Sequence, residues 1–325
     1  MRMKKVIHAL KNTAPGILFR REYWRHRGKR ELKKYSDYEY ICRKYAKLGR
    51  ALDLRDPKRY TEKLQWLKLF WRSESAAICS DKYEVRGYLE QRGYGYLLND
   101  LIAVYDSVDA FDIDALPERF VIKATHGSGW NLIVKDKREV RWFWWKKIMR
   151  SWLKQNLYWF GREWNYEKQT PRIVVEKYLE DDSGELRDYK IFCFNGNAVY
   201  MQLDENRSAS HKRSYFDRSG ERLPIHDSQV RDVASPFRFG PLQAEMFRLA
   251  EALAQPFPSV RADFYECGGR IYFGELTFFD GSGFFSFEPD EWDYIWGEKL
   301  QLPEPNYNLA LYNEIHNQNK ERDSI

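Results

Sequence analysis

The sequence predicts a mixed α/β (α+β) protein whose sheets are built from antiparallel hairpins. The chain has 325 residues, of which 43% are apolar and 17% aromatic, so it can bury a large core. Two runs of strand-forming residues turn at Asn195–Gly196 and at Gly268–Gly269, and such dipeptides are strong hairpin signals. The length suits one large domain or a few subdomains that share their sheets.

The elements are expected in a definite order. Residues 1–45 are predicted to form short helices that break near Pro15 and Gly16. Further helices are expected over 61–92, with a break near Ser73, over the aromatic stretch 139–160 and over 241–255, and strands are expected within 96–107, 119–134, 171–179, 188–203 and 259–279.

The charge is concentrated near the N-terminus. Residues 1–50 contain 16 Lys and Arg against 4 Asp and Glu, so this segment has a net charge of +12. Because the whole chain has a net charge of +6, the remaining residues carry −6. Val6, Ile7 and Leu10 share one helical face, and the lysines around it are Lys4, Lys5 and Lys11. Such a segment suits peripheral contact with the anionic inner membrane surface, or it is a solvated helix pair packed on the body. Nothing downstream resembles a nucleic-acid-binding module, so we expect no nucleic-acid partner.

Several classes of protein are disfavoured. No run of 18 apolar residues is present, so a membrane-spanning helix is not expected, and the N-terminus lacks the features of a secretory signal. The four cysteines are widely spaced without a CxxC pair, which argues against a zinc site or a disulfide framework. We therefore expect a cytoplasmic protein, with membrane contact at most peripheral.

A glycine-rich turn between two strands has the composition of an anion-binding loop. In "VIKATHGSGWNLIV", Lys123 ends the first strand, and Gly127 and Gly129 flank Ser128. Glycines let backbone N–H groups turn toward an anion, and lysine supplies a point charge for phosphate. His126 adjoins the loop and titrates near neutrality, so it would contact phosphate, relay a proton or simply stabilise the loop.

Two carboxylates are expected to face each other in the second hairpin. With its strands paired through Gly268–Gly269, Asp263 and Glu275 lie almost opposite each other, where side chains approach within about 5 Å. Two acids so close repel unless a cation lies between them, and Mg²⁺ suits carboxylates and phosphates. Arg261 shares the face of Asp263 and offers a fork for phosphate or a developing oxyanion. The alternative is a structural salt bridge of Arg261 with either acid.

Two further segments have weaker signals. The strand that ends in Glu176, Lys177 and Leu179 exposes backbone groups that can pair with a purine edge. Asp188 and Lys190 share one strand face, where they would suit ribose hydroxyls and phosphate respectively. The alternative is an ordinary solvated strand edge. The aromatic segment 141–166 either packs in the core or binds a sugar acceptor. Within it lie Trp142, Trp145, Met149 and Trp152 at helical spacing, and Arg162, which would grip a uronate carboxylate.

The order of these motifs resembles the ATP-grasp superfamily, which includes D-alanine–D-alanine ligases and related carboxylate–amine ligases. More specifically, it resembles the TupA-like ATP-grasp family, named for teichuronopeptide biosynthesis and found among bacterial surface-polysaccharide genes. The resemblance covers roughly residues 55–305 and is carried by "TEKLQWLKL", "SDKYEVRGYL", "LPERFVIKATHGSGWNLIV", "DYKIFCFNG" and "VRADFY…IYFGELTFFDGSG".

The resemblance implies two α+β subdomains that grip ATP, and a division of the chain into four parts. Residues 1–54 form a basic helical N-terminal extension. Residues 55–177 form a helical segment plus the first subdomain, with a glycine flap at 126–131. Residues 178–305 form the second subdomain with the metal site, and 306–325 a C-terminal tail.

By the same resemblance, ATP is held from both subdomains, by Lys82, Lys123, Gly127, Ser128, Gly129, Glu176, Lys177, Leu179, Asp188 and Lys190. By the resemblance, Arg261 steadies the transferred phosphoryl group near Lys123. His126 is added to these catalytic candidates because it adjoins the glycine loop.

The metal and substrate positions follow from the same resemblance. Asp263 and Glu275 would hold one or two Mg²⁺ ions, while Thr277 stands where many members of the superfamily have Asn, which leaves the second ion open. Ser282 and Gly283 belong to a turn whose N–H groups would face the substrate carboxylate.

The activity implied is ligation of a carboxylate to an amine through an acyl phosphate, on small-molecule or glycan-linked substrates of a surface polysaccharide. The alternatives are phosphoryl transfer to a glycan hydroxyl and a non-catalytic nucleotide-binding role in glycan assembly.

Overall fold

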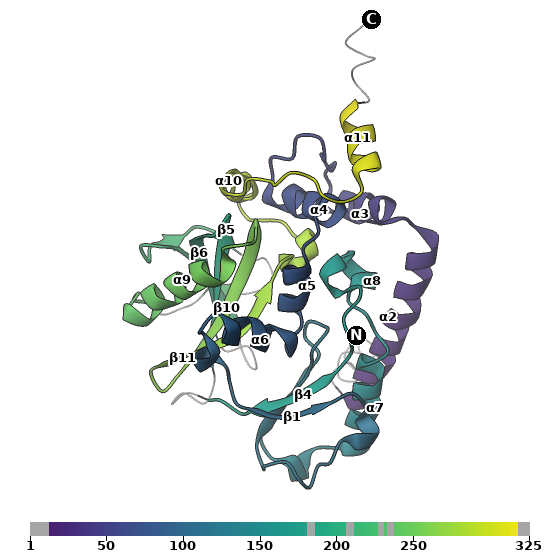
Figure 1. The fold of residues 1–325 in the computed structure, drawn as a ribbon, viewed down its shortest axis with the longest axis vertical. Coiled ribbons are helices and arrows are strands. Elements are labelled where there is room, and N and C mark those ends of the chain that lie inside the picture. The colour runs from purple at the N-terminus through teal and green to yellow at the C-terminus, as the bar shows by residue number, and fades with distance from the viewer. Residues whose placement is uncertain (1–12, 181–185, 206–210, 227–230, 233–236, 318–325) are drawn as a thin grey trace, which may run out of the picture.

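Two sheets and the helices around them make up the protein. The computed structural model describes residues 13–180, 186–205, 211–226, 231–232 and 237–317. The smaller sheet has the antiparallel order β1-β4-β2-β3, and the larger has the order β11-β10-β5-β6-β7-β8, with β9 parallel to β7. In Figure 1 the two sheets lie in different parts of the molecule, with α5 and α6 between them.

The strands of the smaller sheet are β1 (Leu101–Tyr105), β2 (Phe120–Ala124), β3 (Asn131–Val134) and β4 (Ile173–Lys177). Those of the larger sheet are β5 (Asp188–Phe194), β6 (Asn197–Glu205), β7 (Lys212–Asp217), β8 (Arg222–Leu223), β9 (Arg231–Asp232), β10 (Ser259–Cys267) and β11 (Arg270–Thr277). The helices are α2 (Ala14–Lys34), α3 (Asp37–Tyr45), α4 (Tyr60–Phe70), α5 (Glu74–Ser80), α6 (Glu84–Gln91), α7 (Trp142–Trp152), α8 (Tyr158–Gly161), α9 (Pro241–Ala254), α10 (Glu291–Lys299) and α11 (Leu309–Asn317).

Each sheet has its own hydrophobic core. The smaller sheet packs Phe120, Ile122 and Val175 against α7, and the larger sheet packs against α9 and against the helices α4 to α6. Every residue of β5 is buried, because this strand is central in the larger sheet and covered on both faces. The expected α/β (α+β) composition is confirmed.

The N-terminal helix differs from the sequence prediction. The prediction of short helices is wrong over 14–34, because α2 runs unbroken for 21 residues from Ala14 to Lys34. The predicted break near Pro15 and Gly16 falls at the start of this helix, and the segment before Thr13 lies outside the described residues. Pro15 stands in the first turn, where its missing N–H costs no hydrogen bond, and Thr13 Oγ1 accepts from Gly16 N at 3.3 Å. The amphipathic face of Val6, Ile7 and Leu10 lies outside the described residues.

The aromatic helix is shorter than predicted. Residues 139–160 divide into α7 and the one-turn α8, separated by a connection at 153–157. Met149 and Trp152 are buried, and Trp142 and Trp145 pack against the same core under the smaller sheet. Core packing therefore accounts for these four residues.

The hairpin β10–β11 brings the two predicted carboxylates together. Its strands pair Phe264 with Phe273, and a register shift follows, so that Asp263 pairs with Glu275. Regular pairing would have set Gly274 opposite Asp263; the extra residue is a β-bulge at Gly274. A Cβ on Gly274 would lie 3.0 Å from the Asp263 carbonyl oxygen, so glycine suits the bulge.

Two other findings bear on the predictions. Within 306–325, helix α11 packs the Tyr312 ring 5.4 Å from Phe70 and 6.1 Å from Trp66, which the sequence did not indicate. Across the described residues, every helix is either too short or too polar to cross a bilayer.

Candidate functional site

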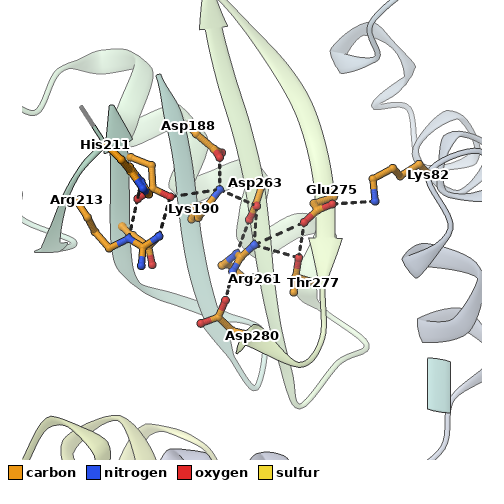
Figure 2. A network of polar contacts seen from close by, with 12 residues as sticks. Lys82, Asp188, Lys190, His211, Arg213, Arg261, Asp263, Glu275, Thr277 and Asp280 are labelled. Carbon is orange, nitrogen blue, oxygen red and sulfur yellow. Dashed lines mark hydrogen bonds and ion pairs between the residues drawn. The ribbon is translucent and has the colours of Figure 1, made fainter. Parts of the chain in front are cut away.

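Charged side chains form a continuous network on one face of the larger sheet (Figure 2). The Arg261 guanidinium donates to Asp263 Oδ1 from Nε at 2.7 Å and to Asp263 Oδ2 from Nη2 at 2.8 Å, and Nη2 lies 3.7 Å from Glu275 Oε1. Lys190 Nζ lies 3.1 Å from Asp263 Oδ2 and also bonds Asp188. The structure thus places Arg261 and Lys190 between carboxylates of three adjacent strands, β5, β10 and β11.

Lys82 reaches this network from outside the larger sheet (Figure 2). It follows α5, and its Nζ lies 3.1 Å from Glu275 Oε2 and donates to the Gly127 carbonyl at 2.8 Å. One ammonium group therefore joins the glycine loop of the smaller sheet to the facing carboxylates of the larger one. Thr277 Oγ1 donates to Glu275 Oε1 at 3.0 Å and completes this end of the network.

The electrostatics keep Glu275 ionised. Removal from water favours the neutral acid, but the charges of Lys82 and Arg261 outweigh this and hold the pKa of Glu275 well below its usual range. Burial raises the pKa of Asp263, and Arg261 and Lys190 oppose that rise. Burial would lower the pKa of Lys190, yet Asp188 and Asp263 raise it above its ordinary value. Glu275 is the more exposed acid, with 30% of its side chain accessible against 4% for Asp263.

A cavity of about 390 Å³ opens between the two sheets beside this network. Its lining includes five of the residues predicted to hold the nucleotide, namely Lys123, Glu176, Lys177, Leu179 and Asp188. Tyr265 and Phe273 add aromatic surface, and a mostly apolar cleft with a few polar groups is the usual form of a small-molecule site. Lys123 Nζ lies 2.6 Å from Glu176 Oε2, so this phosphate-binding candidate is held by an ion pair across β2 and β4.

The glycine loop 126–131 contains both exposed and buried positions. Ser128 and Gly129 are exposed at its tip, whereas Gly127 packs so closely on Trp130 that an added Cβ would lie 2.4 Å from the ring. His126 is buried, its Nε2 lies 3.0 Å from the Trp152 carbonyl, and burial lowers its pKa. This contact fits the loop-stabilising alternative, so we leave His126 out of the reacting centre.

Arg162 requires a correction. The expectation that it grips a substrate carboxylate does not fit, because its side chain is fully buried and already engaged within the chain. Its Nε lies 3.1 Å from Asp37 Oδ1, its Nη2 donates to the Glu31 carbonyl at 3.2 Å, and its guanidinium lies over the Tyr40 ring at 4.2 Å. Arg162 thus braces α8 against α2 and α3.

Ser282 in the turn 280–283 requires a second correction, whereas the role of the Gly283 N–H stays a prediction. Ser282 N donates to the Phe279 carbonyl at 2.9 Å and Ser282 Oγ donates to Glu163, so neither group is directed to a substrate as predicted. The Gly283 carbonyl accepts from Gln65 Nε2 at 2.8 Å. Lys68 Nζ donates to the Ser282 carbonyl at 2.5 Å, which ties the turn to α4.

Sequence reasoning missed several charged residues. Asp280 binds Arg261, and Asp204 is fully buried on β6, where Arg213 Nε donates to its Oδ1 at 2.7 Å. Lys68 and Glu163 are buried around the turn. Asp204 follows the apolar Tyr200, Met201 and Leu203 on β6, and an acid after these residues was a signal available in the sequence. Lys68 and Glu163 gave no such signal.

The donor chemistry fits magnesium. No group of three or more His, Cys, Asp or Glu side chains is placed to bind a metal within the described part of the chain. Mg²⁺ in nucleotide sites, however, is bound through one or two carboxylates plus phosphates and water. Asp263 and Glu275, side by side with the Thr277 hydroxyl, supply such a pair.

Comparisons with known proteins complete the description. A family model described as TupA-like ATP-grasp matches residues 62–301. D-alanine–D-alanine ligase from Bacillus anthracis is similar in structure, with 16% sequence identity, a TM-score of 0.38 and coverage of 62% of this chain and 57% of the ligase. The corresponding ligase from Helicobacter pylori has 13% sequence identity and a TM-score of 0.39, and the match covers 75% of this chain and 70% of that ligase. Phosphoribosylamine–glycine ligase from Thermotoga maritima has 11% identity and a TM-score of 0.39, and the match covers 63% of this chain and 49% of that ligase. The chain thus spans little more than half of the Bacillus ligase. No curated protein matches it.

Proposed function

This chain belongs to the TupA-like ATP-grasp family, as its motifs predicted, and on that premise we propose that it is an ATP-dependent carboxylate–amine ligase. The observation that carries the proposal is the facing pair Asp263 and Glu275, bridged by Arg261 and joined through Lys82 to the glycine loop. A structural salt bridge alone would not require the glycine loop and the nucleotide-sized cavity beside it.

We place the nucleotide in the cavity between the sheets. The purine would lie near Leu179 and the ribose near Asp188, with the triphosphate running toward Lys123 and the glycine loop. Asp263 and Glu275 would hold Mg²⁺, which neutralises the triphosphate charge when bound. Lys82 and Lys123 add positive charge on the opposite wall, where it stabilises charge that develops during phosphoryl transfer.

The reaction proceeds in two steps. The substrate carboxylate oxygen attacks the γ-phosphorus, the bond to the β-phosphate oxygen breaks, and ADP leaves with that electron pair. The amine then attacks the acyl carbon, loses a proton, and displaces inorganic phosphate to leave an amide. Arg261 is placed to stabilise the phosphoryl oxygens and the oxyanion of the second step. Water would destroy the acyl phosphate, so the glycine loop must exclude it.

The substrates that we propose are a glycan-linked or free uronate, or an amino acid, as the carboxylate, and an amino acid or amino sugar as the amine. The setting would be the cytoplasmic stage of surface-polysaccharide assembly. The family's name supports this setting, and the large basic pocket described below supports an acidic substrate.

The test is ADP release by Glu275→Gln, with Glu221→Gln, an exposed acid in the β7–β8 turn, as the control. Loss of a metal ligand removes several kcal/mol of transition-state stabilisation, so we expect a fall of roughly a hundredfold or more with unchanged circular dichroism. Wild-type turnover in Glu275→Gln would refute the assignment.

Hydroxylamine distinguishes the two chemistries open to this fold. It intercepts an acyl phosphate as a hydroxamate, which a ligase forms when the amine substrate is left out. ADP release that yields a phosphorylated hydroxyl and no hydroxamate would instead assign phosphoryl transfer.

A further inference from the structure

A second and larger cavity, separate from the one in which we place the nucleotide, lies between α2, α3 and the connection from α7 to α8. It encloses about 1010 Å³. Its lining, which we name the basic pocket, consists of Arg20, Arg21, Trp24, Arg27, Gly28, Glu31, Tyr35, Tyr40, Arg43, Lys44, Ala46, Lys47, Trp130, Gln155, Leu157 and Phe160. Small-molecule sites of proteins are of this size.

The basic pocket has a large excess of positive charge. Six of its lining side chains are cationic and one, Glu31, is acidic, and Arg27 Nε already lies 2.9 Å from Glu31 Oε1. Among the described residues, no carboxylate forms an ion pair with any of the other five lining cations, Arg20, Arg21, Arg43, Lys44 and Lys47. Burial lowers the pKa of Lys44 to about 8, although the charges of Glu163 and Glu31 oppose this shift. An anionic ligand would add counter-charge to the lining cations.

Aromatic rings alternate with these cations. Trp24 is 41% exposed, and its ring stands edge-on to Phe160 at 6.4 Å. Arg43 lies over the Tyr35 ring at 4.6 Å, and Lys44 over the Tyr40 ring at 5.6 Å. The Tyr35 and Tyr40 rings thus hold cations in place, whereas the exposed Trp24 ring offers apolar surface to the C–H face of a sugar whose acidic groups the cations would bind.

The wall of the pocket is held in place. Glu22 Oε1 accepts from Ser151 Oγ at 2.6 Å, and a Cβ on Gly28 would lie 3.0 Å from Phe160, so α2 packs closely on α7 and α8. Figure 1 shows α2 running alongside both helices. The N-terminal basic helix thus forms a fixed wall of the cavity.

The basic pocket adjoins the glycine loop. Arg21 Nη2 donates to the Gly129 carbonyl at 3.1 Å, and its guanidinium lies over the Trp130 ring at 5.3 Å. On the opposite side, Lys44 lies 4.6 Å from the Phe284 ring, next to the turn that follows β11. A ligand here would lie between the loop predicted to cover the phosphates and the turn that carries Asp280.

We propose that the basic pocket binds an anionic carbohydrate, a sugar that carries a carboxylate or a phosphate group. Its identification as the acyl-donor substrate rests on the proposed function, whereas the binding itself does not. A concave cavity lined by cations and aromatic rings favours a sugar over a membrane surface, which needs an outward-facing apolar stripe.

The test is direct calorimetry on the full chain. The titrants are a glucuronic acid disaccharide, glucose 1-phosphate, the neutral disaccharide cellobiose and vesicles of phosphatidylglycerol. The informative variant is R43E/K47E, because both side chains are exposed and line the pocket. The matched control is R30E/K33E, which changes the net charge equally on exposed positions of α2 outside the pocket. A non-hydrolysable ATP analogue is titrated in parallel.

We expect an acidic sugar to bind and cellobiose to bind weakly. R43E/K47E should lower the affinity for the acidic sugar roughly tenfold or more, since each charge-assisted contact contributes about that factor. R30E/K33E should bind like the wild type. Comparison of the glucuronic acid disaccharide with glucose 1-phosphate then shows whether the pocket prefers a carboxylate or a phosphate group. No binding of either acidic sugar, equal losses in both double variants, or binding to vesicles alone would overturn the proposal.

The nucleotide titration separates this proposal from the ligase function. Sugar binding without nucleotide binding refutes the ligase function but supports the carbohydrate site in the basic pocket. Nucleotide binding without sugar binding refutes the carbohydrate site but leaves the ligase function standing.

Discussion

The ion pair between Lys123 and Glu176 allows the stability of the fold and the binding of nucleotide to be measured apart. Lys123 Nζ lies 2.6 Å from Glu176 Oε2, and the side chains are 20% and 10% exposed. Lys123→Met leaves a carboxylate of low exposure without its cation. Exposed pairs contribute about 0.2–1 kcal/mol and loss of one partner of a buried pair costs about 3–5 kcal/mol, so we expect about 1–3 kcal/mol here.

The experiment is a double-mutant cycle of Lys123→Met and Glu176→Gln, followed by urea unfolding and by binding of a fluorescent ATP analogue. The double variant should recover most of the lost stability, because neither partner is left charged alone. It should not recover affinity, since a lysine–phosphate contact contributes about 1.5–3 kcal/mol, which is roughly tenfold to a hundredfold in Kd. Glu176→Gln alone keeps the Lys123 cation, so it should lose less nucleotide affinity than the double variant does.

The control is Lys168→Met, which removes an exposed lysine elsewhere and should change neither quantity. Wild-type nucleotide affinity in the double variant would show that Lys123 is no phosphate ligand. Unchanged stability in Lys123→Met would show that the pair is not buried enough to matter.

Two further predictions concern the larger sheet. Burial opposes ionisation of Asp204, but Arg213 lowers its pKa to about 2, so Asp204→Asn should lower the free energy of unfolding by about 2 kcal/mol at pH 7. Urea unfolding should show this difference shrinking as the pH falls from about 4 to 2, and a pH-independent difference would contradict the prediction. Gly274→Ala would place its Cβ 3.0 Å from the Asp263 carbonyl oxygen and should cost about 1–3 kcal/mol and lower ADP release, whereas Gly87→Ala, with open space around it, should not; equal effects would contradict the bulge argument.

Local chemistry made much of the fold predictable. Asn195 and Gly196 both have positive φ, as the turn type of a two-residue hairpin requires, so the dipeptide indicated the turn between β5 and β6. The same holds for Gly268 and Gly269. The glycine turn between β2 and β3 was readable for a similar reason, since apolar strands flank it on both sides.

Tertiary packing explains what was not predicted. Arg162 and Lys68 look like surface residues in the sequence, yet both are buried. Lys68 Nζ donates to three acceptors, Gln65 Oε1, the Gly161 carbonyl and the Ser282 carbonyl, which match the three donors of an ammonium group. Gln65 lies on the same helix, but the Gly161 and Ser282 carbonyls come from distant parts of the chain, so no local pattern could indicate this site for Lys68. The basic pocket was missed because its walls, α2, α3 and the connection from α7 to α8, meet only in the folded protein.

The facing of Asp263 and Glu275 shows how a correct prediction can rest on an incomplete reason. Counting outward from Gly268–Gly269 places the two acids nearly opposite each other, but regular pairing would set Glu275 opposite Ala262 and so on the other face of the sheet from Asp263. The bulge at Gly274 adds the one residue that returns Glu275 to the face of Asp263 and Arg261. Because the carboxylates can share a cation only from one face, this glycine determines the site as directly as the acids do.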